Sequence, residues 1–89
     1  MPEVYLDAML SQFVPRRRLD SDATTVGALL DDLEARYPRL RHRLRDETLK
    51  LRPFVKVFVN GEAIDRDGSA SLELRPKDEV QFLHSIQGG

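Results

Sequence analysis

The chain has 89 residues, the size of one small domain, and a formal net charge of −1. A chain this short buries about 60–65% of its unfolded surface, so we expect a modest core. It has no cysteine, which excludes a disulfide framework, a thiol nucleophile and thiolate metal ligands. The near-neutral charge gives no overall attraction to nucleic acid or to an acidic membrane surface.

No apolar run approaches the roughly 20 residues that a membrane-spanning helix needs. The first residues lack the basic segment followed by an apolar segment that marks a secretory signal. We therefore expect a cytoplasmic protein with no membrane partner.

Arginine clusters at residues 16–18 and again within residues 36–45, with acidic residues among and beside both clusters. Aromatic side chains, which would stack on bases, do not interleave with these arginines. We expect a solvated face rather than a nucleic-acid site.

The first predicted strand spans residues 4–10, where apolar and polar residues alternate. Residues 11–15 are typical of a turn. Residues 16–20 are expected to form a second strand in a hairpin with the first, although three arginines give a weak strand signal. The apolar face of the first strand would consist of Val4, Leu6, Ala8 and Leu10.

The clearest element is a helix that begins near residue 26 and ends before Pro38. Residues 21–25 offer several candidate N-caps. Gly27 lowers helix propensity, and the sequence gives no reason for it. The apolar stripe of the helix has the spacing i, i+3, i+4 and i+7, and comprises Val26, Leu29, Leu30 and Leu33.

Residues 39–52 fit either a short second helix or an irregular crossing segment, with Leu40, Leu44 and Leu51 as its apolar positions. Residues 54–59 are β-branched and aromatic, which predicts a strand. Asn60-Gly61 then predicts a hairpin turn into a short apolar stretch, Ala63-Ile64.

The remaining elements are a polar loop at residues 65–71, a short strand at 72–74, a turn at 75–78 and a last strand at 79–83. One amphipathic helix and one sheet must bury their apolar faces against each other, which predicts a two-layer α+β domain. The helix provides a crossover, so the last strand is expected to lie centrally, parallel to the first.

The chain resembles the ubiquitin-like (β-grasp) sulfur-carrier family, which includes the thiamine sulfur carrier and the small subunit of molybdopterin synthase. The resemblance covers nearly the whole domain and depends on residues 25–30 at the helix start, 57–62 at the central hairpin, 78–80 before the last strand, and the terminal Gly88-Gly89. It implies a mixed sheet of four to five strands on one main helix. Residues 1–83 would form the β-grasp domain and residues 84–89 a flexible C-terminal diglycine tail.

Residues 39–52 and the stretch 51–54 are more similar to the molybdopterin synthase small subunit and the cysteine-biosynthesis carrier than to the shorter thiamine carrier. Many relatives have proline or small apolar residues before the diglycine, where this chain has His84, Ser85, Ile86 and Gln87. This departure leaves the pathway that receives the sulfur open.

The resemblance implies a protein co-substrate, or a non-catalytic small subunit of a synthase, rather than an enzyme. A ubiquitin-activating-type partner enzyme would adenylate the carboxyl group of Gly89 with ATP. A sulfurtransferase or another sulfur source would convert it to a thiocarboxylate, and an acceptor synthase would use the sulfide in cofactor, cysteine or specialised-metabolite biosynthesis. No tightly bound cofactor is expected. The alternative is a ubiquitin-like modifier or interaction module that is conjugated through its diglycine end.

The tail has features that suit threading into a partner's narrow channel. Gly88 and Gly89 lack a Cβ atom and permit close backbone approach. Gln87 and Ile86 would enter the channel with them, and Ile86 is expected to contact the partner. The alternative is a frayed end without a role.

Strand alternation predicts a docking surface. If Val57, Val80 and Phe82 face the helix, Phe58 and Leu83 face outward as an exposed apolar pair. Exposed apolar patches often mark interaction sites. The alternative is that another loop covers Phe58.

Other chemistry has little support in the sequence. His42 and His84 have no clear third ligand at metal spacing and no nucleophile between them. Asp31 and Asp32 are adjacent on the predicted helix and do not face each other, so they form no catalytic dyad. We therefore expect no metal site and no catalytic residue.

Overall fold

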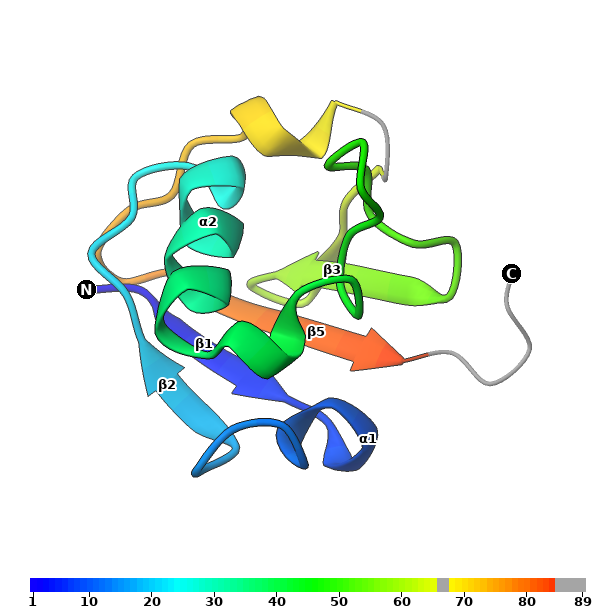
Figure 1. The fold of residues 1–89 in the computed structure, drawn as a ribbon. Helices are drawn as coiled ribbons and strands as arrows, with labels where there is room; N and C mark the ends of the chain where they lie inside the picture. The colour runs from blue at the N-terminus through cyan, green and yellow to red at the C-terminus, as the bar shows by residue number, and fades with distance from the viewer. Residues whose placement is uncertain (66–67, 85–89) are drawn as a thin grey trace.

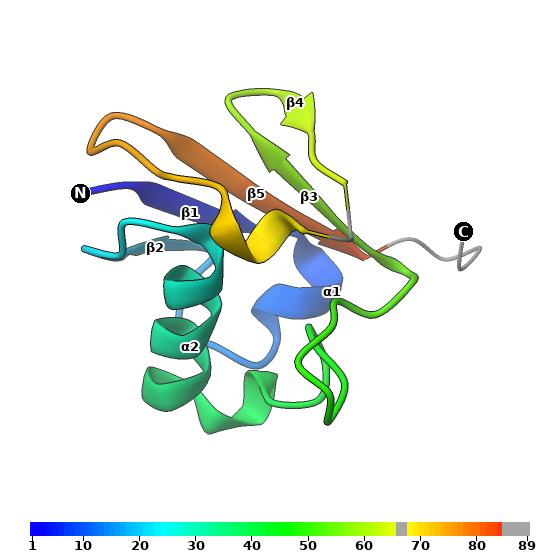
Figure 2. The same ribbon diagram turned by 90° about the horizontal axis from the view of Figure 1, so that it is seen from above.

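The computed structural model describes residues 1–65 and 68–84, which form a sheet with helices packed on one side (Figures 1 and 2). The main helix is α2 (Val26–Arg36), and α1 (Ala8–Ser11) is a single turn. Two 3₁₀ turns span Pro38–Leu40 and Ser69–Ser71. The five strands are β1 (Glu3–Leu6), β2 (Arg18–Asp20), β3 (Val55–Val59), β4 (Glu62–Ala63) and β5 (Glu79–His84).

The sheet is mixed, with the strand order β2-β1-β5-β3-β4. The last strand, β5, is central: it runs parallel to β1, with Val4 opposite Val80, and antiparallel to β3, with Val57 opposite Phe82. The predicted α+β fold, the single main helix and the central last strand are all confirmed.

The core lies between α2 and one face of the sheet. The predicted apolar stripe of α2 is fully buried, as are alternate residues of the three central strands. Figure 2 shows α2 on one side of the sheet, and no described helix covers the other side. The buried core residues of the strands are Val4, Leu6, Leu19, Val55, Val57, Val80 and Phe82.

The predicted first strand is too long, because it ends at Leu6 rather than at residue 10. Asp7 ends it by capping α1: one carboxylate oxygen accepts a hydrogen bond from the Leu10 N–H at 2.9 Å. Ala8 is exposed as a result, while the helical turn still buries Leu10.

The helix α2 begins where the sequence places it. Thr25 is the N-cap, and its hydroxyl accepts from the Ala28 N–H at 3.1 Å. Gly27 is explained by the Ser69–Ser71 turn, which packs against the helix: a Cβ at residue 27 would lie 3.0 Å from the carbonyl oxygen of Ala70.

Residues 39–52 follow the irregular alternative, apart from the 3₁₀ turn at Pro38–Leu40. The three apolar positions predicted for this segment, Leu40, Leu44 and Leu51, are buried, whereas Leu49 is 63% exposed.

The short strand predicted at residues 72–74 is wrong: these residues make one isolated bridge, between Thr25 and Glu73, beside the start of α2. None of the helices in the described ranges is long and apolar enough to cross a membrane.

Candidate functional site

The face of the sheet opposite α2 is the candidate docking surface. The strand register aligns one row of residues on it, running from β4 to β2 through Ala63, Phe58, Gln81, Tyr5 and Arg18. These positions alternate with the buried residues of the same strands, so they point away from the core. The surface therefore has an aromatic ring on each side of the central strand.

Phe58 and Leu83 both lie on this outward face, as their alternation with buried residues predicts. Leu83 is 37% exposed and Phe58 is half-buried. The two are diagonal neighbours, because Phe58 pairs with Gln81 whereas Leu83 pairs with Lys56. An apolar patch flanked by a lysine and a glutamine is therefore available on β3 and β5. Whether a partner binds there stays a prediction.

A polar cluster on β1 and β2 adjoins this patch and was missed in the sequence. The Tyr5 hydroxyl donates to one carboxylate oxygen of Glu3 at 2.7 Å, and the Arg18 guanidinium binds the other. The hydrogen bond from Tyr5, together with that from Arg18, holds the pKa of Glu3 below its ordinary value; the same bond raises the pKa of Tyr5. The alternation of residues 3–5 was visible in the sequence, but the cross-strand partner Arg18 was not.

The start of β5 is fixed by the hairpin turn between β3 and β4. Asn60 and Gly61 both have positive φ, 52° and 84°, as the Asn-Gly prediction requires. The Asn60 amide oxygen accepts from the Glu79 N–H, and its amide nitrogen donates to Asp78, both at 2.9 Å. The Arg75 N–H also donates to the Asp78 carboxylate, at 2.8 Å. These two hydrogen bonds lower the pKa of Asp78, and the bond from the Arg75 N–H has the larger effect.

The end of β5 is the last described part of the chain. His84, which the sequence analysis assigned to the tail, is the final residue of this strand and pairs with Val55. Its ring is tilted against Phe54, with centroids 4.8 Å apart, and its Nδ1 is buried without a hydrogen-bond partner among the described residues. Its backbone N–H donates to Asp7 at 2.7 Å.

The predicted tail residues Ile86, Gln87, Gly88 and Gly89 lie outside the described residues. What the structure supplies is the point from which they continue: the central strand of the sheet. Predictions for Gly89 as the reactive residue, and for the other three in threading, therefore stay predictions.

The arginine clusters are partly engaged within the protein. Arg39 and Arg43 both lie over the ring of Phe13, at 5.4 and 3.9 Å from its centroid. The sequence separates Phe13 from these arginines, but the fold brings them together, so the expected separation of aromatic rings from the arginines is wrong in three dimensions. The ring packs against the core and is covered by guanidinium groups, so it is no open platform for base stacking.

Arg45 is buried and binds two acids of α2. Its guanidinium makes two hydrogen bonds to Glu34, at 2.8 and 3.1 Å, and one to Asp31, at 2.8 Å. Asp31 is therefore part of an ion pair. In the described ranges no cluster of three or more His or acidic side chains could hold a metal ion.

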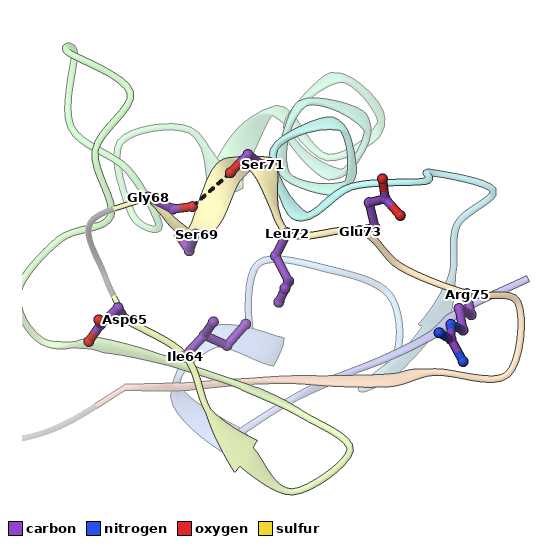
Figure 3. A pocket seen from close by; sticks show the side chains of 8 residues that line it. All are labelled: Ile64, Asp65, Gly68, Ser69, Ser71, Leu72, Glu73 and Arg75. Carbon is purple, nitrogen blue, oxygen red and sulfur yellow. Dashed lines mark hydrogen bonds between the residues drawn. The ribbon is translucent and has the colours of Figure 1, made fainter.

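A pocket of about 470 Å³ lies between the residues after β4 and the Ser69–Ser71 turn. Figure 3 shows Asp65 and Arg75 at opposite ends of it, with Ile64 and Leu72 between them. The hydrogen bond drawn there, from the Ser71 hydroxyl to the Gly68 carbonyl at 3.1 Å, stays within the turn.

Comparison with known proteins gives a consistent result. The sequence profile described as the ThiS family matches residues 8–89. The sulfur carrier protein CysO of Mycobacterium tuberculosis is 32% identical over 76 residues, which cover 83% of this chain and 82% of CysO. The small archaeal modifier protein 3 of Haloferax volcanii is 40% identical over 73 residues, which cover 81% and 76% of the two chains.

Superposition on solved structures agrees with the sequence comparison. A chain of the BexX/CysO complex from Amycolatopsis orientalis superposes with a TM-score of 0.86 at 27% identity, covering 100% of both chains. SAMP1 from Haloferax volcanii superposes with a TM-score of 0.78 at 30% identity, covering 99% of this chain and 98% of that one.

Proposed function

The chain belongs to the ThiS family, and from this membership we propose that it is a ubiquitin-like sulfur carrier that reacts at its C-terminal carboxyl group. The observation that carries the proposal is that the central strand β5 ends at His84, five residues before the diglycine end of the chain. The identity to CysO, a sulfur carrier, supports the same function.

In the proposed chemistry, a partner enzyme supplies the catalytic groups. A carboxylate oxygen of Gly89 attacks the α-phosphorus of ATP, pyrophosphate leaves, and an acyl-adenylate forms. A hydrosulfide equivalent from a sulfur source then attacks the carbonyl carbon and displaces AMP, which leaves a thiocarboxylate. An acceptor synthase consumes the sulfur. ATP is bound by the partner, so this chain acts as a co-substrate rather than as an enzyme.

The outward face of the sheet supplies the docking surface in this proposal. Phe58 and Leu83 would contact the partner while the tail enters its channel. The position of Leu83 supports this assignment, because it lies in β5, one residue before the strand ends. An exposed apolar patch close to the segment that carries the reactive group is suited to recognition by a partner protein.

Intact mass spectrometry tests the carrier function. The chain is incubated with a candidate adenylating enzyme, ATP and a sulfide source. We expect a mass gain that matches the replacement of one oxygen atom by sulfur, and no gain for a chain that lacks Gly89. If no adenylating enzyme of the same organism changes the mass of the intact chain, the carrier proposal is refuted.

A substitution at Phe58 tests the docking surface. Phe58→Arg replaces an apolar anchor with a charge, and we expect the KM of the adenylating enzyme for this chain to rise about tenfold or more. Ala35→Arg is the matched control, because it adds the same group at an exposed position of α2. If folded Phe58→Arg is activated as well as the control, Phe58 is not in the interface.

A protein modifier is the second candidate. It is favoured by the 40% identity to small archaeal modifier protein 3. This function predicts an amide bond between Gly89 and a lysine of another protein, whereas the carrier function predicts a thiocarboxylate. Trypsin last cleaves this chain after Lys77, so tryptic peptides that carry residues 78–89 as a branch on lysine, recovered from cells that express the tagged chain, would identify the modifier.

A further inference from the structure

One carboxylate, that of Asp7, joins the end of β1, the start of α1 and the end of β5. Its Oδ1 accepts from the Leu10 N–H at 2.9 Å, which caps α1. Its Oδ2 accepts from the His84 N–H at 2.7 Å. Its own backbone N–H donates to the Phe82 carbonyl at 3.3 Å.

The second of these bonds extends the sheet beyond its backbone ladder. The parallel pairing of β1 with β5 ends at Leu6 and Phe82. At the next position β1 turns into α1, so its backbone no longer offers a carbonyl to β5. The Asp7 carboxylate takes the place of that carbonyl and accepts from the last amide of the strand.

His84 is consequently held on both edges of β5. On one edge it pairs with Val55 of β3, and its ring packs against Phe54. On the other edge, the contact that the structure gives it is the bond to Asp7. Losing the carboxylate would leave the last residue of the strand paired on one edge.

We propose that Asp7 is a positioning residue for the C-terminal acyl chemistry: it holds the last residue of β5 in the sheet and so fixes the point and direction from which the reactive end of the chain leaves the domain. The inference rests on the proposed function. Ordering one residue before binding spares the partner enzyme the conformational entropy of that residue, which corresponds to about fivefold to thirtyfold in rate.

Three variants separate the two roles of the carboxylate. Asp7→Ser keeps a good N-cap for α1 but has a single short acceptor, so it gives up the bond to His84. Asp7→Asn keeps one carbonyl oxygen and cannot serve both N–H groups as an acceptor. Thr25→Ala is the control, because it removes the cap of α2 and lowers overall stability without touching β5.

Amide hydrogen exchange by NMR tests the contact itself and needs no partner. In Asp7→Ser we expect the His84 amide to exchange about tenfold faster than in the wild type, while the Leu10 amide stays protected. Asp7→Asn is expected to be intermediate. An unchanged exchange rate at His84 in Asp7→Ser overturns the proposal.

Steady-state adenylation, followed by pyrophosphate release, tests the positioning role. We expect the kcat for Asp7→Ser to fall about fivefold while its KM stays within about twofold, because orientation is lost and the docking surface is untouched. An unchanged kcat, or an equal fall in Thr25→Ala, shows that Asp7 acts through stability alone and overturns the proposal. If the wild type is never adenylated, the proposed function fails and the positioning role with it, whereas a failure of Asp7 alone leaves wild-type adenylation intact.

Discussion

The ion pairs of Arg45 allow a quantitative prediction, because the guanidinium binds two acids of very different exposure. The Arg45 side chain is 7% exposed and that of Glu34 is 13% exposed, whereas that of Asp31 is 70% exposed. Glu34 makes two of the three hydrogen bonds. These contacts fasten the irregular segment 39–52 to α2.

Removing the charge of Glu34 should be the costly change. Glu34→Gln leaves the buried Arg45 guanidinium with Asp31, an exposed residue, as its charged partner. Removing one partner of a buried ion pair costs about 3–5 kcal/mol of unfolding free energy. Because Asp31 still offers one bond and Glu34 is not fully buried, we expect a loss of about 2–3 kcal/mol of unfolding free energy. Asp31→Asn should cost less than about 1 kcal/mol, as exposed pairs do.

Urea denaturation followed by circular dichroism measures both losses, with the unfolding slope checked for constancy. Arg45→Met completes the series. It removes the positive charge but keeps an apolar side chain, and the Glu34 carboxylate can be hydrated again. Equal losses for Glu34→Gln and Asp31→Asn would refute the reasoning, because they would show that burial does not decide the strength of these pairs.

Two further predictions concern Gly27 and the carboxyl group of Asp78. Gly27→Ala gains helix propensity of about 1 kcal/mol, but it places a Cβ atom 3.0 Å from the Ala70 carbonyl oxygen. We therefore expect a lower melting temperature. A higher melting temperature would show that the Ser69–Ser71 turn moves away freely. Asp78 has a lowered pKa in the folded chain, so its stabilising contribution is present above its ordinary value of about 3.8 and is lost as the pH falls through the lowered value. The difference in unfolding free energy between the wild type and Asp78→Ala should therefore be constant above about pH 5 and shrink below about pH 4, and a difference independent of pH would contradict this.

Much of the fold follows from local patterns. The stripe of α2 is a contiguous run of helical spacing, and Pro38 stops it at the expected place. Asn60 and Gly61 occupy the left-handed region that their hairpin turn needs. The alternation in β3 and β5 assigns Phe58 and Leu83 to the outward face. Each of these features depends on neighbours within a few residues.

The features that the sequence did not reveal depend on distant partners. Gly27 is required by Ala70, which belongs to another part of the chain. Tyr5 and Glu3 form a cluster only when Arg18 is placed beside them on β2.

The end of β1 could have been found from the sequence. Apolar residues at 4, 6, 8 and 10 fit a strand, but an aspartate three residues before Leu10 is also the spacing of an N-cap. The cap spacing predicts the end of β1, whereas the bond from the His84 N–H to Asp7 joins residues far apart in the sequence.

The central position of β5 has a consequence for folding kinetics. β1 and β3 are both neighbours of β5 and do not pair with each other, so the two halves of the sheet have no hydrogen bonds between them until β5 inserts. The contacts that complete the sheet, such as Val4 with Val80, join residues far apart in sequence, and chains with such contacts fold slowly. A chain cut before Glu79 should remain unfolded, and refolding should gain sheet and protected core in one cooperative step. Partially folded chains would then present no ordered β5, so under the proposed carrier function a partner that docks on β3 and β5 would recognise only a fully folded domain.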